Sequence, residues 1–351
     1  MDEASLHAVV DQSRRKVLKV MGLGVGALAV PGLIPVTAAR AQPADLILRA
    51  IPRTGEQVPA IGLGTHMAFD VKPGKPRDHL REVLRIFYEG GGRVVDVSPL
   101  YGMAEVNVGD FATALGITDE LFMAGKIWAT GEWLGDDSQA LRQLQRSMER
   151  LWRDRFDLMQ CHSLVNAPVI MNLLADWKAE GHIRYLGVTH HLPAEFHALA
   201  PWVEQGKVDF VQLRYNIATR AAEERLLPAA QDTGTAVLVN MPFEKARLFQ
   251  IVKGQALPDF SKEIGVQSWA QFYLKWVISH PAVTCVIPAT TNPKHQADNI
   301  AALKGPLPDA DLRARMLAHM ESLPGFAEVA KQPAYPDKTF DGVVERPGAK
   351  R

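Results

Sequence analysis

The stretch RVVDVSPLYG, residues 93–102, is the first of three strand-like runs that end in polar residues. The second is ELFMAGKIWA, residues 120–129, and the third is FDLMQCHSLV, residues 156–165. Each is a short apolar segment of the kind that forms a buried parallel strand. In a barrel of alternating strands and helices, the C-terminal ends of all strands face one mouth. We therefore expect the polar residues that end these runs to converge there.

Those polar residues are Asp96, Tyr101, Lys126 and His162, and together they suit proton transfer. A carbonyl that accepts hydride develops negative charge on its oxygen and needs a proton as that charge appears. Tyr101 is the predicted donor, although a phenol has an ordinary pKa of about 10. A nearby ammonium on Lys126, held in place by Asp96, would lower that pKa by stabilising the phenolate. A neutral His162 can donate an N–H to the substrate oxygen.

The order of these four residues, with the intact string DVSPLYG, resembles the aldo-keto reductase family, whose tetrad is Asp, Tyr, Lys and His. The resemblance runs from about residue 62 to residue 299. It implies NAD(P)H-dependent reduction of a small aldehyde or ketone, with Tyr101 as the proton donor. Singly, each residue also has a structural interpretation: an ion pair inside a barrel, a Tyr packed at a loop, a satisfied core histidine. Their joint occurrence at strand ends favours a catalytic set.

Strand-like runs alternate with helix-like stretches along the whole chain. The runs lie at residues 60–64, 93–98, 121–127, 156–163, 183–190, 210–216, 236–242 and 283–289. Stretches between them, such as HLREVLRIFYEGG, have the apolar spacing of amphipathic helices. Eight such strands predict an α/β fold, a (β/α)8 TIM barrel, and LILRAIPRTGEQVPAIGLG predicts an N-terminal β-hairpin that plugs the barrel floor. A doubly wound open sheet is the alternative, but no strand is followed by a full GxGxxG turn.

The family resemblance also implies a nicotinamide site at the ends of the later strands. In the family, a Ser-Asn pair and a Gln hold the carboxamide; here GVTHH supplies Thr189 and His190, and VQLRYN supplies Gln212. Asn240 stands where the family stacks a Tyr under the nicotinamide ring, and an amide cannot provide that aromatic face. Thr65, just after the first strand, is a further candidate for cofactor binding.

The segment VIPATTNPKHQADNI is similar to the family's phosphate-binding pattern PKSxxxxRxxEN, which implies contacts to the adenine edge and a helix N-terminus for phosphate. The matching or nearly matching positions are Pro288, Thr290, Asp298 and Asn299. Ala289 and His295 replace the family's Lys and Arg, which weakens the preference for NADPH over NADH, and Lys294 could compensate in part. The alternative is a plain strand–loop–helix in which Asn292 or Thr291 caps the helix.

Residues 1–41 form a segment with its own character. SRRKVLK, residues 13–19, is a twin-arginine signature, followed by the apolar stretch VMGLGVGALAVPGLIPV and by Ala-Arg-Ala at residues 39–41. This pattern predicts a bacterial export signal cleaved after Ala41, a periplasmic protein, and the twin-arginine translocase as a partner during export. A disordered basic tail is the alternative. Pro31 and Pro35 break the apolar stretch, so we expect no membrane anchor.

The rest of the chain divides into a barrel at residues 42–323 and a polar, Pro-rich tail at residues 324–351 that we expect to be irregular. Residues 1–41 carry five basic and three acidic groups, so cleavage changes 39 of each sign to 34 basic and 36 acidic. Such a charge balance makes nucleic acid an improbable partner. Cys161 and Cys285 fall on opposite sides of the barrel, so we expect no disulfide, and no paired Cys or His spacing predicts a metal site.

Export constrains the function, because free nicotinamide nucleotides are not expected outside the cytoplasm. The leading hypothesis is a periplasmic reductase that carries tightly held NADPH or NADH, loaded before export, and reduces a small carbonyl compound. Two alternatives stay open: a periplasmic ligand- or partner-binding protein with an idle tetrad, and nucleotide-independent proton abstraction by Tyr101 and Lys126. Trp128 and Trp133 are candidates for an aromatic wall around an apolar substrate, with His66, Met67 and Phe69 opposite on the loop after the first strand.

Overall fold

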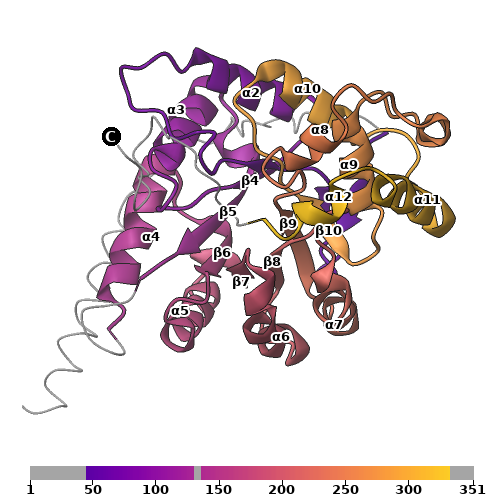
Figure 1. Cartoon of the computed structure of the whole chain (residues 1–351). Coiled ribbons are helices and arrows are strands. Elements are labelled where there is room, and N and C mark those ends of the chain that lie inside the picture. The colour runs from indigo at the N-terminus through magenta and orange to yellow at the C-terminus, as the bar shows by residue number, and fades with distance from the viewer. Residues whose placement is uncertain (1–44, 130–135, 333–351) are drawn as a thin grey trace, which may run out of the picture. The chain divides into compact units, whose positions relative to one another are not determined.

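A computed structural model of the chain describes residues 45–129 and 136–332. Within this part, eight strands lie side by side in the order β3 to β10, and each is parallel to its neighbours. Parallel bridges from Ile61 to Val286 and from Gly64 to Ala289 join the first and last strands, so the sheet closes into a barrel. The observed architecture is the predicted (β/α)8 barrel, with helices outside the strands (Figure 1).

Every predicted strand run contains one strand of the barrel. The strands are β1 (Leu48–Ala50), β2 (Gln57–Pro59), β3 (Leu63–Gly64), β4 (Val94–Asp96), β5 (Phe122–Ile127), β6 (Phe156–His162), β7 (Ile183–His190), β8 (Phe210–Arg214), β9 (Ala236–Asn240) and β10 (Val283–Val286). The helices are α2 (Asp78–Glu89), α3 (Ala104–Leu115), α4 (Ser138–Leu151), α5 (Ala167–Ala179), α6 (Phe196–Glu204), α7 (Leu226–Thr233), α8 (Arg247–Ile251), α9 (Trp269–Ile278), α10 (Pro293–Ala301), α11 (Ala310–Glu321) and α12 (Phe326–Val329). Short 3-10 helices are η1 (Thr118–Glu120), η2 (Pro193–Glu195), η3 (Ala221–Glu223) and η4 (Asp259–Ile264).

Along each barrel strand, alternate side chains point into the barrel, and the inward positions change from apolar to polar toward the C-terminal end. On β8 the inward series is Phe210, Gln212 and Arg214. On β5 it ends with Ala124 and Lys126. The barrel interior is therefore an apolar core at the N-terminal end of the strands and a polar layer at the C-terminal end, which is the end that carries active sites in this architecture.

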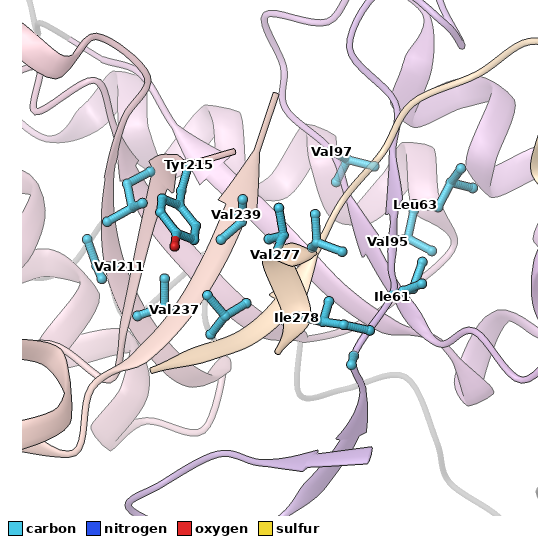
Figure 2. Packing of buried hydrophobic residues seen from close by; sticks show 14 of the residues in the cluster. Ile61, Leu63, Val95, Val97, Val211, Tyr215, Val237, Val239, Val277 and Ile278 are labelled. Atoms are coloured by element: carbon cyan, nitrogen blue, oxygen red, sulfur yellow. The ribbon is translucent and has the colours of Figure 1, made fainter. Parts of the chain in front are cut away.

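The outward side chains of the strands form the main hydrophobic core with the helices. Figure 2 shows part of this core, including Val237 and Val239 of β9 and Val277 and Ile278 of α9, and all four are buried. β-branched residues at every second position suit a strand that packs against a helix on one face. The two cysteines lie in different clusters, because Cys161 faces this outer core and Cys285 faces the barrel interior. Both thiols are free.

The hairpin β1–β2 lies at the N-terminal end of the barrel strands and pairs in antiparallel register. Its Ile51 and Val58 belong to the buried interior cluster. In the same cluster, the rings of Phe122, Tyr185 and Phe210 lie with centroids 5.4–6.0 Å apart. The hairpin thus covers an aromatic layer that fills this end of the barrel.

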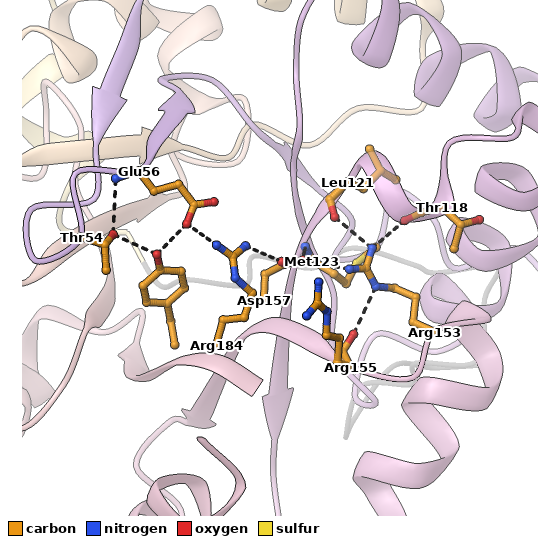
Figure 3. Close-up of polar contacts among 10 residues, drawn as sticks. Thr54, Glu56, Thr118, Leu121, Met123, Arg153, Arg155, Asp157 and Arg184 are labelled. Atoms are coloured by element: carbon orange, nitrogen blue, oxygen red, sulfur yellow. Dashed lines mark hydrogen bonds and ion pairs between the residues drawn. The ribbon is translucent and has the colours of Figure 1, made fainter. Parts of the chain in front are cut away.

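A polar network fastens the hairpin turn to the strands (Figure 3). Glu56 accepts hydrogen bonds from the Tyr185 hydroxyl at 2.6 Å and from the Arg184 guanidinium. Arg184 also donates to Asp157 at 2.9 Å, and Asp157 accepts a further bond from Arg153 at 3.1 Å. Glu56, Arg184, Asp157 and Arg153 each therefore have an opposite charge in direct contact.

Several predictions fall on residues outside the described part, namely the export signal at 1–41, Trp133, and the tail at 333–351. Residues 324–332 are described, and they differ from the predicted irregular tail because they contain α12. Phe326 and Val329 of this helix are buried, so tertiary packing stabilises a single turn that the polar composition does not predict. No helix of the described residues has the length and apolar character needed to cross a membrane.

Candidate active site

The four residues of the predicted tetrad come together at the C-terminal mouth. Asp96 ends β4, Lys126 lies near the end of β5, and His162 ends β6. Tyr101 lies in the loop between β4 and α3. Lys126 Nζ lies 4.9 Å from the centroid of the Tyr101 ring, and the His162 ring lies edge-on to it with centroids 5.8 Å apart. The structure thus joins a phenol, an ammonium, a carboxylate and an imidazole in one cluster.

Asp96 and Lys126 form a buried ion pair, with side chains that are 3% and 1% exposed. The ammonium donates to the Asp96 carboxylate and, at 3.0 Å, to the Val97 carbonyl oxygen. Burial lowers the pKa of Lys126 and the Asp96 carboxylate opposes that shift. Burial raises the pKa of Asp96, and Lys126 and the Gln212 amide oppose that shift. These contacts therefore fix the ammonium in position beside the Tyr101 ring.

The loop that carries Tyr101 is held by a turn within the loop and by a contact to Asp70. The Tyr101 N–H donates to the Ser98 carbonyl oxygen at 3.0 Å, and the Met103 N–H donates to Asp70 Oδ1 at 2.9 Å. Gly102 between them has a φ of +58°, and a Cβ there would lie 2.1 Å from the Asp70 carboxylate. Only glycine fits this close approach in a left-handed conformation. The string DVSPLYG thus fixes the phenol through its turn geometry as well as its chemistry.

His162 is a neutral imidazole in this setting. Burial, and next the charge of Lys126, hold its pKa well below the ordinary value. Its Nδ1 lies 3.1 Å from the Ser98 hydroxyl oxygen. A neutral ring can offer one N–H to a substrate oxygen, which is the role predicted from the sequence.

Two further histidines lie at the mouth. The His66 ring is 4.7 Å from the Tyr101 ring, centroid to centroid, and burial lowers its pKa to about 3. His191 follows β7, and burial, with the neighbouring His190, lowers its pKa to about 4. We did not single out His191 in the sequence, although its position directly after His190 at a strand end was a usable signal. The mouth is therefore lined by imidazoles that stay uncharged near neutral pH.

Arg214 and Glu244 form a second buried ion pair that the sequence analysis missed. Arg214 ends β8 and donates through Nε to Glu244 at 2.7 Å, with the two side chains 3% and 0% exposed. Glu244 also accepts from Asn216 and from the Thr219 hydroxyl. Because Glu244 lies in the loop after β9, this carboxylate ties that loop to β8. Arg214 lies two residues beyond Gln212 and so shares its inward face, which was the available sequence signal.

Three predicted cofactor residues lie on adjacent strands at the mouth. Thr189 of β7 pairs in register with Gln212 of β8, and Arg214 pairs with Asn240 of β9. Gln212 Oε1 and Asn240 Oδ1 are buried acceptors without a hydrogen-bond partner. A nicotinamide carboxamide carries an NH2 group, so its donors fit these acceptors. His190, beside Thr189, accepts from the Leu192 N–H through Nδ1 at 3.2 Å, which leaves Nε2 as the protonated nitrogen of a neutral ring.

The remaining predicted cofactor residues are engaged within the protein. Thr65 is buried and donates through its hydroxyl to the Asp96 carbonyl oxygen at 2.6 Å, so it stabilises the tetrad strand. In α10, Asp298 accepts from Gln271 at 2.6 Å, and Asn299 is buried. Thr290 accepts from the Asn292 N–H at 3.1 Å. These contacts give each side chain a structural role in addition to the predicted one.

The N-terminus of α10 has an internal cap. The Asn292 side chain accepts from the Lys294 N–H at 2.9 Å, and Pro293 occupies the first turn. This is the capping arrangement that the sequence offered as an alternative to phosphate binding. Over the described residues, no group of three or more His, Cys, Asp or Glu side chains could hold a metal ion.

The substrate side of the mouth carries exposed apolar surface next to the tetrad. Leu100, which precedes Tyr101, is 41% exposed. Trp128 follows β5, and its backbone N–H donates to Gln143 Oε1 at 3.0 Å while the Gln143 amide donates to its carbonyl oxygen. These two hydrogen bonds from α4 fix the backbone of Trp128 two residues after Lys126.

Known proteins are similar to this chain in fold and in sequence. The family model described as Aldo/keto reductase family matches residues 60–315. Methylglyoxal reductase YeaE of Escherichia coli (strain K12) is 28% identical over 262 residues, covering 73% of this chain and 89% of the relative. The NADH-specific methylglyoxal reductase of the same organism is 24% identical over 200 residues, covering 48% of this chain and 60% of the relative.

Among solved structures, an aldo/keto reductase from Klebsiella pneumoniae in complex with NADP and acetate is 26% identical, with a TM-score of 0.61. The match covers 76% of this chain and 93% of that one. Fold and mouth together define a (β/α)8-barrel oxidoreductase. The chain belongs to the aldo-keto reductase family, and it is an NAD(P)-dependent enzyme of that type.

Proposed function

We propose that this protein reduces a small aldehyde or ketone, with Tyr101 as the proton donor. The observation that carries the proposal is the cluster of Tyr101, Lys126 and His162 at the mouth, with Lys126 Nζ 4.9 Å from the phenol ring. An ammonium at this distance favours the phenolate form and so eases proton release from a weak acid. Asp96 keeps the ammonium oriented through a buried ion pair.

In the proposed reaction the nicotinamide nucleotide supplies the hydride to the carbonyl carbon. His162, as a neutral ring, donates an N–H to the carbonyl oxygen and stabilises the negative charge that develops there. Tyr101 transfers its hydroxyl proton to the same oxygen, which completes the alcohol. The phenolate that remains is stabilised by Lys126 until a proton from solvent restores it.

The proposed cofactor contacts come from the ends of β7, β8 and β9. The buried acceptors Gln212 Oε1 and Asn240 Oδ1 suit the carboxamide NH2, and His190 Nε2 suits its carbonyl oxygen. Asn240 offers no aromatic face, so ring placement depends on these hydrogen bonds. Ala289 and His295 lack the charge that grips a 2′-phosphate, and we therefore propose that NADH and NADPH are both accepted.

We propose 2-oxoaldehydes such as methylglyoxal as the first substrates to test. Two curated relatives are methylglyoxal reductases, which supports a small, polar carbonyl substrate for this chain as well. The exposed Leu100 and the anchored Trp128 give the mouth apolar surface next to the carbonyl site. If larger apolar aldehydes are reduced faster than methylglyoxal, we expect Leu100 and Trp128 to bind the apolar part of the substrate.

A direct test compares the wild type with Tyr101→Phe in the oxidation of NADH and NADPH by methylglyoxal and a panel of aldehydes. We expect Tyr101→Phe to lower kcat by roughly 10²- to 10⁴-fold without changing nucleotide affinity, because only proton donation is lost. Tyr185→Phe is the matched control, since that phenol lies at the opposite end of the barrel. Equal rates for Tyr101→Phe and wild type would reject the proposed donor.

We also propose that the chain is exported to the periplasm by the twin-arginine pathway with its nucleotide already bound. The SRRKVLK signature and the Ala-Arg-Ala site support export, and this pathway carries folded proteins. The test is cell fractionation of the full chain beside a variant with Arg14→Lys and Arg15→Lys. Periplasmic protein that begins at residue 42 and contains nucleotide supports the proposal, whereas an unchanged location in the double variant contradicts it.

A second candidate function is ligand or partner binding without turnover. It is favoured by Asn240, which stands where the family stacks an aromatic ring on the nicotinamide. Calorimetry with NADH and NADPH separates the two candidates. Micromolar or tighter nucleotide binding supports the reductase, and binding of a carbonyl compound without nucleotide binding or turnover supports the second candidate.

A further inference from the structure

Ser98 links the two groups that flank the substrate oxygen in the proposed reaction. It lies between Asp96 and Tyr101 in the string DVSPLYG and is fully buried. Its carbonyl oxygen accepts the Tyr101 N–H at 3.0 Å, and its hydroxyl lies 3.1 Å from His162 Nδ1. One residue therefore contacts both the proton donor segment and the imidazole.

The hydrogen bonds of the Ser98 hydroxyl define the direction of the contact with His162. The oxygen accepts the Leu100 N–H at 3.2 Å, which uses one lone pair. The hydroxyl hydrogen still needs an acceptor, and His162 Nδ1 is the one that the described residues provide. A buried hydroxyl without an acceptor is unfavourable, so the O–H donates to Nδ1.

This direction determines the tautomer of the ring. A neutral imidazole has one protonated and one unprotonated nitrogen, so an accepting Nδ1 requires a proton on Nε2. Nε2 makes no hydrogen bond to any described residue, and it is not among the buried atoms that lack a partner, so it is open toward the mouth. The opposite tautomer would direct a lone pair at the substrate oxygen and repel it.

We propose that Ser98 is a positioning residue that holds His162 as its Nε2–H tautomer, so that the ring donates a hydrogen bond at the mouth. The proposal rests on the proposed reductase function for its catalytic consequence. The tautomer itself is a property of the folded protein and can be measured without any substrate, so the two proposals fail separately.

The primary experiment is nitrogen NMR of protein labelled with ¹⁵N-histidine at pH 7.5, where protonated and unprotonated ring nitrogens have well separated shifts. The chain has 11 histidines, and the His162→Gln spectrum identifies the signals of His162 by their loss. We expect a protonated Nε2 and an unprotonated Nδ1 in the wild type. Ser98→Ala should shift His162 toward the other tautomer or toward a mixture. A protonated Nδ1 in the wild type, or an unchanged ring in Ser98→Ala, overturns the proposal.

Kinetics supply a second readout. We expect Ser98→Ala to lower kcat/KM for carbonyl reduction by roughly 10- to 100-fold, because a donor to the substrate oxygen is lost while Tyr101 remains. Ser261→Ala is the matched control, because it removes a buried hydroxyl that has no hydrogen-bond partner and lies in η4. Thermal melts of both variants identify simple misfolding. A wild-type rate for Ser98→Ala with an altered tautomer would reject the catalytic role of the tautomer.

Discussion

The two ends of the barrel use buried polar groups in opposite ways. At the floor, Asp157 accepts from the Met123 N–H, Arg153 and Arg184, so each of its oxygens is bonded. At the mouth, Gln212 Oε1 and Asn240 Oδ1 are buried without a donor. An unbonded buried acceptor costs free energy, and at the mouth a ligand that carries donors can recover that cost. The Asp157 network is thus satisfied within the protein, whereas these two acceptors at the mouth are available to a ligand.

The same strands generate both ends. β8 begins with Phe210 in the apolar interior and ends with Gln212 and Arg214 in the polar layer. A barrel strand can change from apolar to polar side chains along its length, because its backbone hydrogen bonds go to the neighbouring strands and do not depend on the side chains. Substitutions at the floor should therefore change the free energy of unfolding alone, and substitutions at the mouth should change catalysis, alone or together with stability.

Lys126→Met is expected to have the largest effect, because it affects both properties. It leaves Asp96 buried without its counter-ion, which should lower the free energy of unfolding by about 3–5 kcal/mol, and it removes the charge beside Tyr101. We expect almost no carbonyl reduction in nucleotide oxidation assays and a large shift in the urea midpoint. Lys275→Met is the control, since that buried ammonium bonds the Ile264 and Pro306 carbonyl oxygens away from the mouth. Loss of turnover in Lys275→Met as well would mean that the loss in Lys126→Met reflects lower stability and not the missing charge beside Tyr101.

Asp157→Asn tests the floor alone. The amide removes one charge and turns one accepting oxygen into a donor, so the Met123 N–H or the Arg184 guanidinium loses its partner. Arg153 keeps its bonds to the Thr118 and Leu121 carbonyl oxygens, which limits the loss to about 2–3 kcal/mol. Urea unfolding should report this loss while kcat below the melting temperature stays at the wild-type value. A kcat that falls in parallel with stability would indicate coupling between floor and mouth.

The contrast between the ends also explains how much the sequence predicts. The alternation along three strands was sufficient to predict that Asp96, Lys126 and His162 meet at one mouth. The position of a residue in a parallel strand determines how far along the barrel axis it lies and whether its side chain points inward. The eight strand runs were found for the same reason, and only their ends differ. The position of a strand and the facing of its side chains are local properties, and the apolar patterns encode them directly.

Contacts made by loops were not predictable in this way. Glu244, which contacts Arg214, lies in a loop where Glu244, Lys245 and Ala246 all adopt positive φ values without a glycine, and no sequence pattern indicates this. His191 faces the mouth because the chain leaves β7 at His190. The Ser98 contact depends on the ring orientation of His162, which is a tertiary property. Loop geometry therefore remains the part of the site that coordinates must supply.

Acid should lower the free energy of unfolding through the buried imidazoles at the mouth. His66 and His191 have folded pKa values of about 3 and about 4, against about 6.5 when unfolded. Between pH 6.5 and about 4 the unfolded chain binds protons that the folded chain excludes, so stability falls as the pH falls. Each group contributes up to about 1.4 kcal/mol per pH unit in this range. Urea unfolding from pH 7.5 to 4.5 should show this slope.

The variant His191→Gln isolates one of these protons. Its free energy of unfolding should fall less steeply with decreasing pH than that of the wild type, because unfolding then takes up close to one proton fewer. His197→Gln, a replacement of the same kind at an exposed position on α6, is the control for the substitution itself. Parallel slopes for wild type and His191→Gln would show that the mouth imidazoles do not resist protonation.

Glu56→Gln is expected to have the smallest effect and addresses the hairpin itself. The carboxylate is 31% exposed and its partner Arg184 is 36% exposed, so solvent screens the ion pair. The amide oxygen can still accept the Tyr185 hydroxyl, and the apolar contacts of Ile51 and Val58 remain. We therefore expect a loss of about 0.5–1 kcal/mol in urea unfolding and no change in kcat. A loss above about 3 kcal/mol would mean that charge, more than the apolar contacts of the hairpin, holds the floor closed, because screening alone cannot account for so large a value.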